Sequence, residues 1–140
     1  MQRATEFCHP ERSEGSLILL YIALGSAAGG VLRYLIGSTI QRSTGGTFPL
    51  GTLLINITGS FLLGFLYRYA PSGSEMSAEV RAMLTVGLCG GYTTFSSFSY
   101  ESVRLIEDGQ AGKALLYVGL SVLLCLAATF VGMVAGRRVV

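Results

Sequence analysis

Four long apolar segments constrain the fold of this chain more than any other feature of its sequence. They cover approximately residues 17–40, 50–69, 83–103 and 114–135. A helix needs about 20 apolar residues to cross roughly 30 Å of hydrocarbon, and each segment is long enough. Only 13% of the residues are charged, against about 25% in an average soluble domain. The sequence therefore predicts an all-α integral membrane protein with four transmembrane helices.

The segments between these helices are short and polar. Residues 41–48, 71–82 and 105–113 are rich in Gly, Ser or charged side chains, which is typical of interfacial loops. Residues 17–140 are thus expected to form one four-helix transmembrane domain. Residues 1–16 are polar, carry charges of both signs and show no periodicity, so we expect a disordered N-terminal extension or an upstream choice of start codon. They lack a signal-peptide pattern, because the charged stretch is too long.

Charge and reactive residues exclude several classes of function. The net charge of +2 is too small to indicate a nucleic-acid partner. The only histidine, His9, lies in the expected extension, and no acid–base or metal-binding constellation is present, so we do not expect an enzyme. Cys8, Cys89 and Cys125 are an odd number without metal-type spacing, and we expect no disulfide.

Positive charges are nearly balanced between the two sides of the predicted bundle. One side carries Arg68, Arg81, Arg137 and Arg138, and the other carries Arg42, Arg104 and Lys113. Arg3 and Arg12 add to the first side if the extension is present. The excess of positive charge in loops sets orientation, so a nearly unbiased protein can insert both ways round. This permits an antiparallel, dual-topology homodimer.

Glycines recur along the predicted helices, most clearly as the pairs Gly25/Gly29 and Gly132/Gly136. Small residues at this spacing let helix backbones approach closely in lipid. They serve packing either within one subunit or between subunits. Four helices are few to enclose a pore on their own. We therefore expect an oligomer.

The third apolar segment contains the most informative stretch. Residues 93–99 hold five hydroxyl side chains and two phenylalanines, directly after the sequence Gly90-Gly91-Tyr92. A Gly pair followed by β-branched threonines is poor helix material, so we predict a break near Gly90–Thr93. Free backbone groups at mid-membrane are tolerated where they line a cavity or coordinate an ion. One or two of the hydroxyls can instead bond back to the helix.

Phe95 and Phe98 are three residues apart and share one face of the helix after the break. Such pairs usually serve packing, but the electropositive edge of an aromatic ring can also face an anion. Polar stripes in two other segments lead to the same alternatives. Their members are Thr52, Asn56 and Ser60 in the second segment, and Tyr117, Ser121 and Cys125 in the fourth. They act as interhelical hydrogen-bonding groups or line a path for a small anion. Arg33 is a functional candidate or a residue that snorkels to the interface.

These residues resemble a known family, the Fluc (CrcB) fluoride channels. The resemblance rests on residues 30–34 (GVLRY) in the first helix, 51–64 (GTLLINITGSFLLG) in the second, and 87–99 (GLCGGYTTFSSFS) with Glu101 in the third. It covers the whole chain after residue 16. The motif in the third helix is the most specific of the three.

The resemblance implies a fluoride-specific channel that lets fluoride leave the cytoplasm passively and so lowers its toxicity. It also implies a dual-topology homodimer in the inner (plasma) membrane. Fluoride would pass the ring edges of Phe95 and Phe98, with Asn56 supplying an amide donor. Thr52, Tyr117 and Ser121 would match the polar track, with Arg33 a further candidate for the fluoride path. A structural sodium ion at the dimer centre would be held by the backbone carbonyls of Gly90 and Thr93.

The sequence departs from the family pattern at Cys125, where a serine is more usual. Because a thiol is a weak hydrogen-bond donor, we expect conduction to survive this change. Two other classes of function compete with a channel. A small proton-coupled exporter of cations needs a membrane-embedded carboxylate, and the first three segments offer none before Glu101. A non-transporting scaffold would leave the hydroxyl-rich stretch unexplained.

Overall fold

Long helices dominate the computed structural model, which describes residues 10–71 and 76–138. Helix α1 covers Pro10–Thr44, α2 covers Leu50–Tyr69 and α6 covers Ala111–Arg137. Each of the three is long and apolar enough to cross a membrane, and they coincide with the first, second and fourth predicted segments. Because α1 begins at Pro10, residues 10–16 continue this helix. Residues 1–9 of the expected extension lie outside the described residues.

The third predicted segment is divided into several consecutive helical elements. Helix α3 covers Ala78–Ala82, the π-helical element η1 covers Met83–Cys89, α4 covers Gly90–Tyr92 and α5 covers Phe95–Glu107. Between α4 and α5, Thr93 and Thr94 are extended, with ψ angles of 158° and 114°. The predicted break is therefore present, but it lies at the C-terminal edge of the expected range. Gly90 itself is helical, with φ −65° and ψ −38°.

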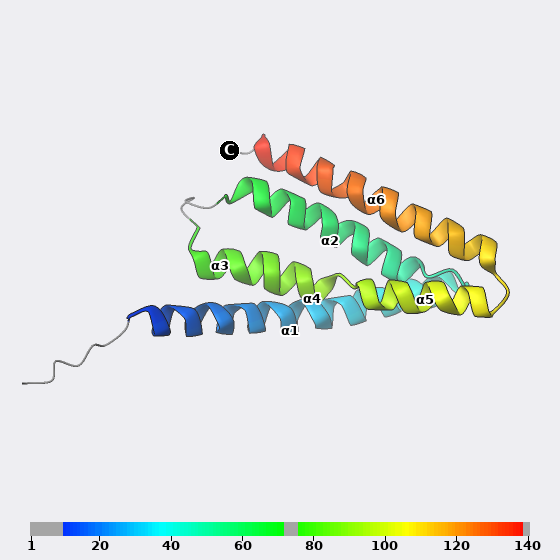
Figure 1. The fold of residues 1–140 in the computed structure, drawn as a ribbon, viewed down its shortest axis with the longest axis horizontal. Helices are drawn as coiled ribbons and strands as arrows, with labels where there is room; N and C mark the ends of the chain where they lie inside the picture. Colours follow the sequence, from blue (N-terminus) through cyan, green and yellow to red (C-terminus); the bar gives the residue numbers. More distant parts are fainter. Residues whose placement is uncertain (1–9, 72–75, 139–140) are drawn as a thin grey trace, which may run out of the picture.

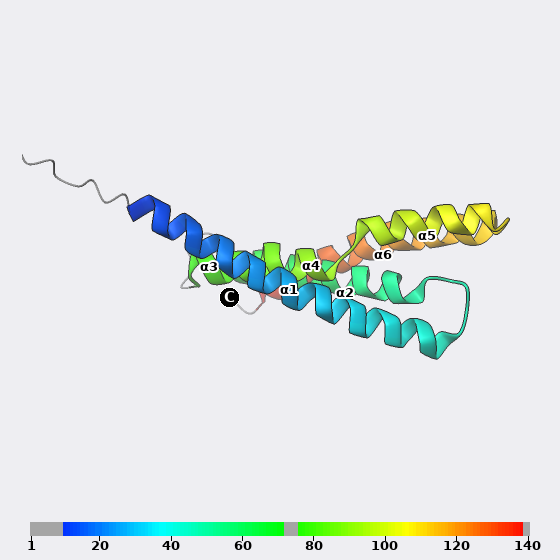
Figure 2. The ribbon, with the colours of Figure 1, turned by 90° about the horizontal axis from the view of Figure 1, so that it is seen from below.

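Helices α1, α2 and α6 and the α3–α5 run lie roughly alongside one another (Figure 1). Helix α2 packs along α6, while α1 packs against η1 and α4. Figure 2 shows α5 and α6 turning away from α1 and α2 toward the end that holds the α1–α2 and α5–α6 connections.

The two connections at that end are tight and tied together. Gly45 and Gly109 have φ angles of 59° and 72°, a left-handed conformation that glycine adopts without strain. The Lys113 ammonium donates to the Thr47 hydroxyl at 3.0 Å and to the Gln110 side-chain oxygen at 2.7 Å. The network joins the α1–α2 connection to the start of α6.

The glycine pairs serve packing within one protomer. A Cβ atom on Gly29 would overlap the backbone carbonyl of Leu88 in η1, and one on Gly132 would overlap the carbonyl of Phe61 in α2. Gly25 and Gly136 are crowded by neighbouring backbone in the same way. These glycines let helix axes approach closely, so their spacing gives no argument for an oligomer.

The distribution of apolar and polar residues is that of a protein surrounded by lipid. On α6, Leu115 is 76% exposed and Phe130 is 68% exposed, whereas Ser121 is only 6% exposed. Thr85 and Thr94 are likewise buried, at 6% and 7%. Large apolar side chains on the outside and hydroxyls on the inside are what a hydrocarbon solvent favours.

Candidate functional site

A groove of about 340 Å³ lies beside the break in the third segment, between α2, α5 and α6. Its polar and aromatic lining residues are Asn56, Ser60, Thr93, Thr94, Phe95, Phe98, Ser121 and Cys125. The two phenylalanines and members of both predicted polar stripes therefore meet in one place. Sequence spacing placed these residues on three separate helix faces, and the fold brings the three faces together.

Asn56 fixes the backbone at the break. Its side-chain oxygen accepts a hydrogen bond from the Thr94 N–H at 2.8 Å, and its Nδ2 donates to the Thr94 carbonyl at 3.1 Å. The Thr94 hydroxyl in turn accepts from the Ser97 N–H at 3.2 Å and so caps α5. An amide nitrogen carries two hydrogens, and Thr94 takes only one of them. The second is available for a ligand in the groove.

Ser121 brings a second donor to the same groove. Its hydroxyl oxygen is buried and has no hydrogen-bond partner within the part of the chain that the structure describes. Leaving a buried polar group unpaired costs about 1–3 kcal/mol, so such groups are rare without a reason. A hydroxyl that lines a cavity and lacks a protein partner is suited to contact a ligand there.

Phe95 and Phe98 form the aromatic wall of the groove. Their ring centroids are 5.4 Å apart with planes tilted by 46°, so the rings do not stack face to face. Phe98 also packs on Tyr117, at a centroid distance of 5.3 Å. Phe95 is 78% exposed in the single chain. One chain thus holds Phe98 in place but leaves most of the Phe95 ring uncovered.

Thr52 and Tyr117 lie at a second polar centre, formed around Glu101. The Thr52 hydroxyl donates to Oε1 of Glu101 at 2.7 Å, and the Tyr117 hydroxyl donates to Oε2 at 2.7 Å. Tyr117 is completely buried. The motif in the third segment includes Glu101, but sequence reasoning gave it no role. Its two partners lie on other helices, so no local pattern could reveal them.

Arg33 lies in a cavity of about 250 Å³ between α1, α2 and α5. Thr52, Thr94 and Glu101 line this cavity as well. Thr94 also lines the groove, so this residue separates the two spaces. The predicted residues therefore form two adjoining groups: one of donors and rings in the groove, and one around Arg33 and Glu101.

The break leaves backbone carbonyls without their usual helical donors. In a continuous helix the Gly90 carbonyl would accept from Thr94 N–H, and the Thr93 carbonyl from Ser97 N–H. Both donors are redirected, the first to Asn56 and the second to the Thr94 hydroxyl. No group of three or more His, Cys, Asp or Glu side chains suited to a metal ion occurs among the described residues. The carbonyls of Gly90 and Thr93 are thereby free of these helical hydrogen bonds.

Comparison with known proteins identifies the family. The family model described as CrcB-like protein, Camphor Resistance (CrcB), matches residues 20–133. The chain belongs to the CrcB family. The match confirms the resemblance drawn from the motifs, and it covers every residue that lines the groove.

Relatives of this CrcB-family chain match most of its length and almost half of the residues in the matched part. Proteins named fluoride-specific ion channel FluC are 43% identical in Rhizobium meliloti, over 87% of this chain and 98% of theirs, and 46% identical in Thermus thermophilus, over 86% and 96%. A protein of the same name in Methylococcus capsulatus is 49% identical over 88% of this chain, which spans 54% of that longer protein.

These relatives are named as ion channels, which agrees with the prediction that the chain is not an enzyme. Family membership and the apolar helices together make this CrcB-family chain a multi-pass integral protein of the plasma membrane.

Proposed function

We propose that this protein is a fluoride-specific ion channel through which fluoride leaves the cytoplasm passively, lowering its toxicity. Relatives that bear this name and cover nearly the whole chain support the substrate. The observation that carries the proposal is the unpaired, buried Ser121 hydroxyl in a groove that also holds Asn56 and two phenylalanines. This groove offers an anion several weak donors and no positive charge.

Weak donors suit fluoride for a physical reason. The ion is small and strongly hydrated, so a pore must replace its water with other donors. It must also release the ion again, which a tight cationic site would prevent. In the proposed mechanism the Ser121 hydroxyl and the second Asn56 N–H take the place of water, while the ring edges of Phe95 and Phe98 face the ion. None of these groups carries a full charge.

Arg33 and the Glu101 centre would form the approach to the groove. The guanidinium raises the local concentration of anions in its cavity, which adjoins the groove at Thr94. Glu101 is a hydrogen-bond acceptor and cannot itself bind fluoride, and Thr52 and Tyr117 donate to its two oxygens. Those two hydroxyls are therefore available to fluoride only when they leave the carboxyl group.

The proposed channel is an antiparallel homodimer. Phe95 is 78% exposed in one chain, and a groove open on one side cannot shield a fluoride ion from lipid. A second copy would close it. The near balance of cations on the two sides of the bundle allows this copy to lie in the opposite orientation.

The proposed structural sodium ion would bind the carbonyls of Gly90 and Thr93. Their freedom from helical hydrogen bonds supports this assignment, and unwound backbone carbonyls coordinate sodium in other membrane proteins. Two carbonyls are too few for one ion, so two copies would have to contribute at the dimer centre. The ion would join the two copies and would not take part in conduction.

Fluoride efflux from liposomes tests the proposed function. Purified protein is reconstituted, and fluoride release down its gradient is followed with a fluoride electrode, with chloride-loaded liposomes as the control. We expect rapid fluoride release and chloride release no faster than from protein-free liposomes. Fluoride release at the protein-free rate would refute the proposal, and equal release of both ions would refute the specificity.

A further inference from the structure

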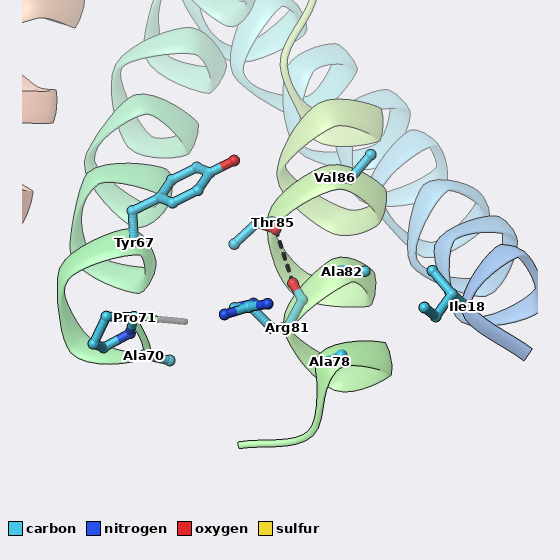
Figure 3. A pocket seen from close by; sticks show the side chains of 9 residues that line it. All are labelled: Ile18, Tyr67, Ala70, Pro71, Ala78, Arg81, Ala82, Thr85 and Val86. Carbon is cyan, nitrogen blue, oxygen red and sulfur yellow. Dashed lines mark hydrogen bonds between the residues drawn. The ribbon is translucent and has the colours of Figure 1, made fainter. Parts of the chain in front are cut away.

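A further cavity lies at the opposite end of the described residues from the connections that Lys113 ties together. It has a volume of about 550 Å³ and is bounded by α1, the C-terminal end of α2 and the α3–η1 run. Figure 3 shows Tyr67 on one side, Ile18 on the other, and Arg81 and Val86 between them. None of its lining residues belongs to the groove or to the Glu101 centre, so the proposed function does not account for it.

Arg81 is a half-buried cation, and no counter-charge reaches it from the side chains that the structure describes. Its guanidinium forms no ion pair or hydrogen bond with these side chains, which are those of residues 15–71 and 76–138. Its backbone is bonded within the helix, where the carbonyl accepts from the Thr85 hydroxyl at 2.8 Å. In Figure 3 the guanidinium points across the cavity toward α2. Glu79 lies two residues away, on a different face of α3, and does not line the cavity. Partly burying a cation is costly without an anionic partner.

The position of the cavity indicates what that partner is. Arg68 lies in the last turn of α2 and Arg137 in the last turn of α6, both at this end of the bundle. Arginines and tyrosines at helix ends mark the boundary between hydrocarbon and headgroups. Ile18 and Val86 give the cavity apolar walls, and Val86 is 54% exposed. A cation at headgroup depth thus lies beside a surface that faces acyl chains.

We propose that this cavity binds one anionic phospholipid, with its phosphate on Arg81 and the start of an acyl chain along Ile18 and Val86. Basic pockets between transmembrane helices bind anionic headgroups in this way. The guanidinium can donate two parallel hydrogen bonds to one phosphate group. A free phosphate ion would leave the apolar walls uncovered, so the lipid is the ligand that uses both parts of the cavity.

Native mass spectrometry of the purified protein with added phosphatidylglycerol or phosphatidylcholine tests this proposal. We compare the unchanged protein with Arg81→Gln and with Arg68→Gln, which removes an exposed arginine at the same end and changes the net charge equally. We expect phosphatidylglycerol to bind in preference to phosphatidylcholine, and Arg81→Gln to weaken its binding about tenfold. Arg68→Gln should bind almost as the unchanged protein does.

A second variant tests the cavity without changing any charge. Ala78→Leu places a larger side chain on the exposed lining residue at the start of α3, and it should also reduce binding of phosphatidylglycerol. Inorganic phosphate at millimolar concentration should not displace the lipid, and displacement would reassign the site to a free anion. Equal losses in Arg81→Gln and Arg68→Gln, or no preference between the lipids, would overturn the proposal.

Fluoride release separates this proposal from the proposed function. Arg81→Gln should still release fluoride from liposomes, because its cavity shares no residue with the groove. If the unchanged protein bound phosphatidylglycerol but released no fluoride, the lipid site would stand and the channel proposal would fall.

Discussion

At the scale of single residues, the hydroxyl groups inside the bundle differ in whether they have a hydrogen-bond partner. The Thr94 hydroxyl is fully engaged by its neighbours Ser96 and Ser97, and the Thr52 and Tyr117 hydroxyls are engaged by Glu101. Ser121 is buried, as Thr94 and Tyr117 are, yet its hydroxyl finds no partner among the described residues. Among these three buried residues, the lack of a partner singles out Ser121 as the one that faces the proposed ion.

Ser121→Ala should therefore reduce fluoride release from liposomes roughly tenfold, because a hydrogen bond to a charged group contributes about 1.5–3 kcal/mol. Thr129→Val is the matched control on the same helix. It also removes a hydroxyl, but that hydroxyl donates to the Cys125 carbonyl at 2.9 Å. Equal release by Ser121→Ala and the unchanged protein would exclude Ser121 from the path.

The aromatic rings need a test that keeps their volume. Phe95→Ile and Phe98→Ile each remove a ring edge while leaving an apolar side chain, and each should lower fluoride release roughly fivefold. Tyr69→Ile is a suitable control, since Tyr69 stacks on Phe65 at the far end of α2. Undiminished release by both Phe variants would leave the channel intact and remove the rings from its mechanism.

At the scale of helices, close approach of backbones holds the bundle together. Gly132 lies against the Phe61 carbonyl in α2, whereas a Cβ atom added to Gly119 on the same helix would meet nothing within 4 Å. Gly132→Ala should therefore cost about 1–3 kcal/mol of stability through overpacking. Gly119→Ala should cost nothing and gain slightly from better helix propensity. Thermal unfolding in detergent measures both, and equal midpoints for the two variants would contradict this account.

The helices also show where sequence reasoning succeeds and where it stops. Hydropathy located α2 correctly because a membrane span is a local property of about 20 residues. Helix propensity placed the break at Gly90–Thr93, because Gly-Gly is locally the weakest helix material. Gly90 stays helical, and the extended residues are Thr93 and Thr94. Asn56 sets the break instead. It lies 38 positions away in the sequence, and its side chain forms hydrogen bonds with both the N–H and the carbonyl of Thr94. The hydrogen-bond partners of Glu101 could not be predicted from the sequence either, because they lie on two other helices.

At the scale of the whole molecule, charge balance and an open groove both favour a dimer of opposed chains. Reporter fusions at the C-terminus should therefore give signals on both sides of the membrane from one population of protein. Adding two arginines beside Arg137 should shift this population to one orientation, because positive loops stay inside. Signal on a single side before any change would refute dual topology.

The uneven packing of α5 links the unfolding of this helix to the dissociation of the proposed dimer. Among residues 95–107 only Leu105 is buried, and the helix touches α6 far more than α2. A segment with so few buried contacts is a candidate for local opening. If a second copy covers it, dissociation and melting of α5 become one coupled equilibrium. Diluting the protein in detergent should then speed hydrogen–deuterium exchange in α5 first, while α2 stays protected.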